Sequence, residues 1–363
     1  MSVTVHIDGQ PAGHFERYVE VLDQLGLIPN ESESSFEIWT EQPQDRATPQ
    51  SVWLNPPTGA IRAKWLQDGG AIVSARSVAG ATEDCLLRGS TVVTVRSSAD
   101  VAIKALVLAA FLAHDFPLVD ALMLARAYRG NGWPNDLSDY PVPVGGPAST
   151  TPFAPFPRNA GLYAVVPTSE WVHRLAESGV PVVQLRNKHA DAPRVVEICK
   201  AIKAAAGTNT LLFINDDWRF AIEHGAYGIH LGQEDIDTAD LAAIQRAGLR
   251  LGISTHGIYE MLRAHACKPS YLALGAIYAT ATKEMPTVPQ GLRRLQHYVR
   301  LMSPHYPLVA IGGIDLSRIS GIWATGVDCA AVLRAIVDAS DYQKTTADLL
   351  ATTPQVTCTS GAA

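Results

Sequence analysis

The stretch Leu211–Asp235, LLFINDDWRFAIEHGAYGIHLGQED, indicates the fold of the second half of the chain. It predicts a strand over Leu211–Ile214, a helix over Trp218–His224 and a second strand over Tyr227–His230. Short apolar runs that end in acids or amides are typical of parallel strands whose two faces are both covered. The stretch therefore predicts an α/β fold built from strand–helix units.

Each of these two strands is followed by a polar tip that carries an aspartate. Asp216 follows the first strand, and Asp235 closes the tip after the second. In α/β barrels the chemistry lies at the carboxyl ends of the strands, and two carboxylates that converge there are ligands that suit Mg²⁺. The alternative is that these polar residues only cap the helices that follow.

The strand–helix pattern repeats from Gly161 onward, with a helical pattern after each strand. The expected strands are Gly161–Val166, Val180–Leu185, Thr210–Ile214, Tyr227–His230, Arg250–Ile253, Tyr271–Leu274, Leu308–Ile311 and Val327–Val332. Eight strands that alternate with eight helices predict a (β/α)8 TIM barrel. We place this barrel at 160–350, followed by a disordered tail at 351–363, and expect the long connection at 275–291 to be functional or mobile.

Length and composition narrow the class of protein. A chain of 363 residues predicts two domains, and a net charge of −6 argues against nucleic-acid binding by bulk charge. Five unpatterned cysteines predict reduced thiols in a cytoplasmic protein. The N-terminus does not resemble a signal peptide, and the longest apolar run, Ala102–Ala113, is too short to span a membrane. We therefore expect small-molecule partners, with a homo-oligomer left open.

Residues 1–132 predict a smaller α/β domain in front of the barrel. Its expected elements are strands at Val52–Leu54, Ala71–Ser74 and Thr91–Val95, helices at Arg17–Gly26, Ala99–His114 and Leu118–Arg129, and a loop at Glu31–Gln50. Seven prolines within 133–159 predict an extended, semi-rigid linker that contains the domain boundary.

The run Val93–Asp100, VTVRSSAD, precedes two Ala-rich helices. It resembles the C-terminal end of hydroxymethylpyrimidine and phosphomethylpyrimidine kinases of the ribokinase-like family, which places Asp100 at the catalytic-base position. Ser97, Ser98 and Ala99 stand where that family has glycines, which let backbone N–H groups approach a phosphate closely. The resemblance implies a kinase remnant without catalysis; the alternative is an unrelated accessory or dimerisation module.

The other strand tips of the predicted barrel are polar as well. Strand alternation aims Gln184, Arg186 and Lys188 to one side, which suits a polyanion, although a solvated surface pair is the alternative. The remaining tips supply hydroxyls, histidines, amides, a lysine and a Gly-Gly turn: His230, Gln233, Ser254, Thr255, His256, Thr280, Thr282, Lys283, Gly312 and Gly313. Such a turn either faces a phosphate with its N–H groups or is simply tight. Together the tips predict a diphosphate–Mg²⁺ pocket and a monophosphate pocket.

Six ordered motifs across 161–337 carry a more specific resemblance. They are Gln184-x-Arg186-x-Lys188, Ile214-Asn215-Asp216, His230-Leu231-Gly232-Gln233-x-Asp235, Gly252-x-Ser254-Thr255-His256, Thr280-x-Thr282-Lys283 and Ile311-Gly312-Gly313-Ile314. In this order and spacing they resemble thiamine phosphate synthase. The resemblance implies a transferase that joins 4-amino-2-methyl-5-hydroxymethylpyrimidine diphosphate to 4-methyl-5-(2-phosphoethyl)thiazole, giving thiamine phosphate and pyrophosphate.

The same resemblance implies roles for the residues at the diphosphate. Arg186, Lys188 and Lys283 would stabilise the charge that develops on the departing pyrophosphate. Asp216 and Asp235 would hold Mg²⁺. The C–O bond breaks first in this family, and the thiazole nitrogen then attacks a pyrimidine-stabilised cation, so no nucleophilic side chain is expected.

The remaining implied roles concern binding. Gln184 and Asn215 would position the pyrimidine and the diphosphate. Ser254 would donate a hydrogen bond to the leaving group and would act as a catalytic residue with the three cations. His230 and His256 are expected to be structural or positioning groups. The thiazole phosphate would be seated by three donors: Thr280, Thr282 and the amide of Gly313.

One position departs from the family pattern, and two other functions compete. Many family members have a small hydroxyl residue where this chain has Leu333–Ala335, so Arg334 either faces a phosphate or points to solvent.

A paralogous thiazole tautomerase shares the barrel but needs no diphosphate–Mg²⁺ pocket. A non-catalytic regulator of the pathway would not need acids and lysines at every tip.

Overall fold

The computed structural model describes most of the barrel half of the chain and parts of the first half. The described residues are 5–7, 10–11, 20–21, 23–25, 36–39, 51–54, 60–78, 81–88, 90–97, 105–130, 132–188, 193–280 and 288–354. The chain divides into two compact units, the first formed by Met1–Gly146 with Gly257–Arg263, and the second by Pro147–His256 with Ala264–Ala363. The change from the first unit to the second after Gly146 falls within the predicted linker.

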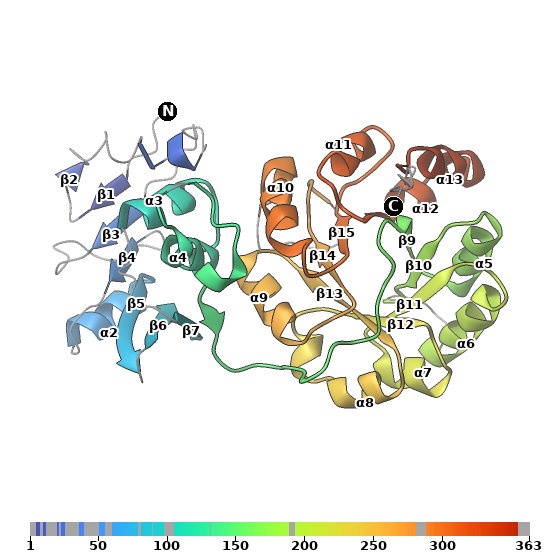
Figure 1. The fold of residues 1–363 in the computed structure, drawn as a ribbon, viewed down its shortest axis with the longest axis horizontal. Helices are drawn as coiled ribbons and strands as arrows, with labels where there is room; N and C mark the ends of the chain where they lie inside the picture. Colours follow the sequence, from blue (N-terminus) through green and yellow to red (C-terminus); the bar gives the residue numbers. More distant parts are fainter. Residues whose placement is uncertain are drawn as a thin grey trace, which may run out of the picture. The chain divides into compact units, whose positions relative to one another are not determined.

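The second unit contains a closed barrel of eight parallel strands (Figure 1). The strands are β9 (Gly161–Val166), β10 (Val182–Leu185), β11 (Leu211–Asn215), β12 (Gly228–Leu231), β13 (Arg250–Thr255), β14 (Tyr271–Leu274), β15 (Leu308–Ile311) and β16 (Cys329–Val332). Each strand pairs with its neighbours in sequence, and β16 closes the ring on β9. The predicted TIM barrel is confirmed, with each strand within two residues of its expected ends.

A helix follows every strand of the barrel, as the pattern predicts. The helices are α5 (Ser169–Glu177), α6 (Arg194–Ala205), α7 (Trp218–Glu223), α8 (Leu241–Arg246), α9 (Ile258–Ala266), α10 (Gly291–Met302), α11 (Ile319–Trp323), α12 (Arg334–Val337) and α13 (Tyr342–Ala351). Two of them begin at aspartates that accept a backbone N–H: Asp240 at 2.8 Å from Ala243 N and Asp341 at 2.9 Å from Lys344 N. These side chains satisfy amide groups that a helix start leaves without intrahelical partners.

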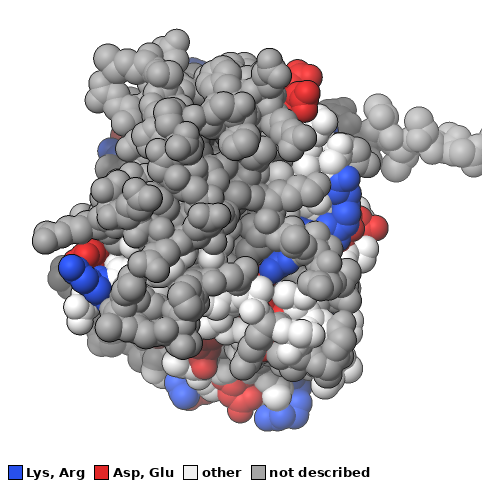
Figure 2. All heavy atoms as spheres, turned by 90° about the vertical axis from the view of Figure 1, so that its left-hand side faces the viewer, with Lys and Arg blue, Asp and Glu red and all other residues white. Residues whose placement is uncertain are grey.

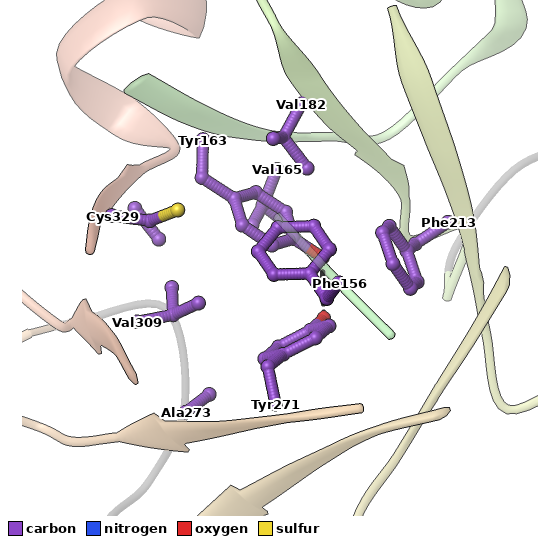
Figure 3. Packing of buried hydrophobic residues seen from close by; sticks show 10 residues of the cluster. Phe156, Tyr163, Val165, Val182, Phe213, Tyr271, Ala273, Val309 and Cys329 are labelled. Carbon is purple, nitrogen blue, oxygen red and sulfur yellow. Dashed lines mark hydrogen bonds between the residues drawn. The ribbon is translucent and has the colours of Figure 1, made fainter. Parts of the chain in front are cut away.

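Aromatic rings fill the interior of the barrel (Figure 3). Tyr163 of β9, Phe213 of β11 and Tyr271 of β14 are at most 1% exposed and pack with their ring centroids 5.2–6.2 Å apart. Space for the Tyr271 ring comes from Gly252 of β13, where a Cβ atom would lie 2.1 Å from its Cζ. Gly252 is therefore a packing requirement of the barrel core.

The proline-rich segment is more ordered than the predicted linker. It contains a 3-10 turn, η1 (Leu137–Asp139), and the short strand β8 (Val142–Pro143), which pairs with β7 of the first unit. Further along, Phe156 is 4% exposed and packs against Phe213 and Tyr271. The segment thus ends with an aromatic ring packed in the barrel core, and the extended linker stays a prediction.

The first unit is built on a mixed eight-stranded sheet in the order β2-β1-β3-β4-β5-β6-β7-β8. Its strands before β8 are β1 (Val5–Ile7), β2 (Gln10–Pro11), β3 (Phe36–Trp39), β4 (Ser51–Leu54), β5 (Ala71–Val78), β6 (Ala81–Arg88) and β7 (Thr91–Ser97). Its helices include α2 (Ala60–Gln67), α3 (Ala105–Ala113) and α4 (Leu118–Ala127). The predicted smaller α/β domain is confirmed in class, but the prediction of a loop over Glu31–Gln50 is wrong at β3.

A buried ion pair explains why the sequence pattern does not predict β6 as a strand. Asp84 of β6 and Arg126 of α4 are 0% and 3% exposed, and Arg126 Nε donates to Asp84 Oδ2 at 2.7 Å. Glu83, beside it, is 3% exposed and pairs with Arg96 of β7. Charged residues at buried positions obscure the alternation that predicts a strand, and here each carboxylate is compensated by a guanidinium.

Some predictions for the first unit cannot be compared with the structure. Asp100, Ser98 and Ala99 lie outside the described residues, so the kinase-like resemblance stays a prediction. The predicted helix at Arg17–Gly26 is described only in part, with residues 20–21 and 23–24 helical.

On the face drawn in Figure 2, described acidic and basic side chains lie next to one another. Within the described part of the chain, no helix has the length and apolar character to cross a membrane.

Candidate active site

A cavity of about 570 Å³ opens at the carboxyl ends of the barrel strands. Every predicted site residue that the structure describes lines it: Gln184, Arg186, Lys188, Asn215, Asp216, Asp235, Ser254, Thr280 and Gly313. His256, Gly312 and Arg334 line it too. Thr282 and Lys283 belong to 281–287, outside the described residues. The strand tips thus bring together residues that lie far apart in the sequence, from Gln184 to Arg334.

A lysine and an aspartate meet at the tips of β10 and β11. Lys188 Nζ lies 2.8 Å from Asp216 Oδ2. The backbone of Asp216 has a φ of 62°, and its N–H donates to the carbonyl oxygen of His230 at 3.0 Å. The N-cap of α7 is Asp217, whose side chain makes no capping hydrogen bond. The carboxylate of Asp216 therefore faces a cation in the cavity.

The second carboxylate, Asp235, follows β12. Its Oδ2 accepts the N–H of Gly232 at 3.0 Å, which holds it at the rim of the cavity. Burial and then the neighbouring charge of Asp216 raise the pKa of Asp235, while Lys188 and the Gly232 amide act in the opposite direction. The charge of Asp216 thus acts on Asp235, and both carboxylates line the same cavity.

This donor set fits Mg²⁺ when a substrate completes it. Mg²⁺ is commonly held by one or two carboxylates together with phosphate oxygens and water, and Asp216 and Asp235 supply two carboxylates. The structure's described residues include no group of three or more His, Cys, Asp or Glu side chains arranged for a metal. A metal at this site would therefore depend on oxygen ligands from a bound diphosphate.

At the floor of the cavity, a chain of hydrogen bonds crosses the barrel, and all its members except Tyr271 line the cavity. Gln184 Nε2 donates to Tyr163 Oη, the Tyr163 and Tyr271 hydroxyls bond each other, and His230 Nδ1 contacts Tyr271 Oη, each at 2.8 Å. His230 Nε2 in turn lies 2.8 Å from Ser254 Oγ. Burial lowers the pKa of His230 to about 4, so this ring is neutral at physiological pH. The chain joins two site residues, Gln184 and Ser254, from separate strands.

A glycine turn forms the wall of the cavity beside β15. Gly312 and Gly313 have φ values of 105° and 64°, and the Gly312 carbonyl accepts the N–H of Tyr278 at 3.0 Å. This bond ties the turn to the loop that carries Thr280. In the order of the closed barrel β15 lies four strands from β11, so the glycine turn stands across the mouth from Asp216.

We expect Gly313→Ala to weaken binding at this wall. A Cβ atom there would lie 2.6 Å from Ala279 O and 2.8 Å from Tyr278 Cβ, so the Thr280 loop must shift. Under the reaction proposed below, the KM for the thiazole phosphate should rise about tenfold, the equivalent of about one hydrogen bond, with little change in the KM for the pyrimidine diphosphate. Steady-state kinetics with each substrate varied in turn measures both values.

Gly179→Ala is the matched control. Gly179 has a φ of 75° but would place its Cβ with nothing within 4 Å. Both variants lose about 1 kcal/mol because an L-residue is unfavourable in the left-handed region, and both unfolding temperatures should fall. An equal rise of the KM for the thiazole phosphate in the two variants would contradict the assignment of Gly313 to the thiazole phosphate site.

Two arginines that lie outside the six motifs, Arg318 and Arg334, also line the cavity. Arg318, which no motif includes, donates from Nη1 to Gly313 O at 2.7 Å. Its Cζ atom lies 4.9 Å from the ring centroid of Tyr278. Arg334 is held by Asp338, with Nε 2.9 Å from its Oδ2. Arg318 lies in no motif, and no other signal in the sequence distinguishes it.

The barrel half of the chain is similar in sequence to known proteins. The family described as thiamine monophosphate synthase matches residues 162–336. The thiamine-phosphate synthase of Pectobacterium atrosepticum is 50% identical over 202 residues, which cover 55% of this chain and 95% of that protein. This chain belongs to the thiamine phosphate synthase family. The thiamine-phosphate synthase of Neisseria meningitidis serogroup A is 53% identical over 191 residues, which cover 52% of this chain and 92% of that protein.

A solved thiamine phosphate pyrophosphorylase from Pyrococcus furiosus is 28% identical, with a TM-score of 0.48, and the match covers 54% of this chain and 96% of that one. The predicted membership of the thiamine phosphate synthase family is confirmed by the sequence relatives. The family match begins at residue 162, so it gives no information about residues 1–161.

Proposed function

We propose that this chain condenses 4-amino-2-methyl-5-hydroxymethylpyrimidine diphosphate with 4-methyl-5-(2-phosphoethyl)thiazole, giving thiamine phosphate and pyrophosphate. The observation that carries the proposal is the single cavity in which a lysine, an arginine and two carboxylates stand across the barrel mouth from a glycine turn. One side suits a diphosphate with its metal, and the other suits a monophosphate.

The diphosphate side is formed by the tips of β10, β11 and β12. Asp216 and Asp235 would hold Mg²⁺ through their carboxylates, and the ion would neutralise charge on the diphosphate oxygens. Lys188, 2.8 Å from Asp216, and Arg186 supply positive charge at the same tips. These cations would stabilise the negative charge that grows on the departing pyrophosphate.

The substitution itself needs no protein nucleophile. The C–O bond between the pyrimidine methylene and the diphosphate breaks, and its electron pair leaves with the pyrophosphate. The thiazole nitrogen then forms the new C–N bond to the methylene carbon. Neutral His230 is 7% exposed and bonded at both ring nitrogens, so it is not placed as a general base. The protein binds, orients and excludes water.

The monophosphate side is formed by the loops after β14 and β15. Thr280 and the Gly313 amide would bind the thiazole phosphate, and the Gly312–Tyr278 hydrogen bond keeps the two loops together. Thr282 and Lys283 retain the roles that the family resemblance implies for them. Gln184 and Asn215 would orient the pyrimidine between the two anion sites.

The test is the product formed by the full chain. Incubation with both substrates and Mg²⁺, followed by chromatography and mass spectrometry, should show thiamine phosphate appearing as both substrates disappear. A tautomerase would isomerise a thiazole precursor and leave the pyrimidine diphosphate untouched. A regulator would consume neither substrate, so either result would refute the proposed synthase reaction.

A further inference from the structure

The donor at its first atom gives the hydrogen-bond chain at the floor of the cavity a consistent direction. It starts at the side-chain amide nitrogen of Gln184, which can only donate, so Tyr163 Oη accepts there. The Tyr163 hydroxyl has one proton, and a hydrogen bond to Tyr271 Oη, 2.8 Å away, gives that proton an acceptor. The Tyr271 hydroxyl in turn gives its proton to His230 Nδ1.

The direction continues through the histidine to the cavity. A neutral imidazole that accepts at Nδ1 carries its proton at Nε2, and this N–H donates to Ser254 Oγ at 2.8 Å. Ser254 Oγ therefore accepts from below, and its own proton is available to a ligand above. Gln184, at the other end, lines the cavity, and its Oε1 can only accept.

Burial keeps water from competing with this chain. Tyr163 and Tyr271 are 1% and 0% exposed, and Gln184 and His230 are 4% and 7% exposed. Gly252 gives the Tyr271 ring its place, since any Cβ there would overlap the ring. Hydrogen bonds in such a dry interior polarise one another along the chain. Each hydrogen bond donated toward Ser254 therefore makes the Ser254 hydroxyl a better donor.

From this geometry we infer that Tyr271, together with Tyr163 and His230, is a positioning residue that makes Ser254 a hydrogen-bond donor to the departing diphosphate. The inference rests on the proposed function, because it assumes that a diphosphate oxygen faces Ser254. Donation into the cavity suits an anion that gains charge as the C–O bond breaks. The same direction leaves Gln184 Oε1 to accept a hydrogen bond from an amino group such as that of the pyrimidine.

Tyr271→Phe interrupts the chain and retains the ring that fills the core. We expect kcat for thiamine phosphate formation to fall about tenfold, as when one well-placed hydrogen bond is lost, while the KM for the thiazole phosphate stays unchanged. Tyr163→Phe should show the same pattern. In a Ser254→Ala background the Tyr271→Phe change should have no further effect on kcat, because its effect is transmitted through Ser254.

Tyr306→Phe is the matched control. Tyr306 is 7% exposed, and its hydroxyl contacts His265 Nδ1 at 2.9 Å, so it has the same tyrosine–histidine chemistry away from the residues lining the cavity. This variant should lose stability comparable to that of Tyr271→Phe in thermal unfolding and keep its kcat. A similar kcat loss in both variants would mean that Tyr271 acts only through stability and would overturn the inference.

A second readout does not depend on activity. Nitrogen-15 NMR of histidine-labelled protein, with His230 assigned from a His230→Asn variant, reports which ring nitrogen carries the proton. The inference requires the Nε2–H tautomer in the wild type and a mixture in Tyr271→Phe. An Nδ1–H tautomer in the wild type would reverse the chain and overturn the inference. A wild type that makes no thiamine phosphate would overturn the proposed function instead, with the inference falling as its consequence.

Discussion

Asp216→Asn should reduce kcat/KM for the pyrimidine diphosphate roughly 10²–10³-fold, the range seen when a preorganised charge-stabilising group is removed. The change preserves the size of the side chain and removes the charge that faces Lys188 at 2.8 Å. It also leaves Asp235 as the remaining carboxylate for Mg²⁺, so higher Mg²⁺ should restore part of the rate. Initial rates of pyrophosphate release over a range of Mg²⁺ concentrations measure both effects.

The neighbouring Asp217 provides a matched control. Its Oδ1 lies 3.5 Å from Nη1 of Arg194, the first residue of α6, and Asp217 is not among the residues that line the cavity. Asp217→Asn should therefore keep its rate and its Mg²⁺ dependence. Equal rates for the wild type, Asp217→Asn and Asp216→Asn would show that Asp216 holds no part of the diphosphate site.

Lys188→Met should lower kcat by about 10²-fold, because its ammonium group is expected to act most strongly on charge that exists only after the C–O bond begins to break. Methionine keeps most of the alkyl stem and removes the donor, so packing should change little. The KM for the pyrimidine diphosphate should rise less than kcat falls. The comparison requires kcat and KM measured separately, since a loss of uniform binding would raise KM alone.

Lys200→Met controls for the loss of a lysine. Lys200 is exposed on α6 and pairs with Glu197 at 3.6 Å, away from the cavity lining. Its substitution should leave both kinetic constants unchanged. An unchanged kcat with a raised KM in Lys188→Met would contradict the assigned role in the transition state, although it would still place the lysine at the substrate.

The barrel could be predicted from sequence because parallel strands covered on both faces appear as short apolar runs. The eight strands and the polar residues at their tips follow from that pattern alone. Arg186, Lys188 and Asp216 were predictable for the same reason, since a polar side chain directly after a buried strand lies at the mouth of the barrel.

The support beneath the site could not be predicted in this way. Tyr163 and Tyr271 stand 108 positions apart on strands that are not adjacent, and their contact depends on how side chains meet inside the barrel. Phe156 belongs to a proline-rich segment whose composition suggests a linker, although its ring is buried with theirs. In the first unit, Asp84 looks exposed in sequence because its partner Arg126 is 42 residues away.

The most direct test of the account is pyrophosphate release by the full chain with Mg²⁺, measured with both substrates present and with each omitted in turn. The account predicts release that requires both substrates and equals the thiamine phosphate formed. It also predicts that removal of Mg²⁺ by a chelator abolishes this release. No release from folded protein with both substrates and Mg²⁺ would contradict the proposed reaction.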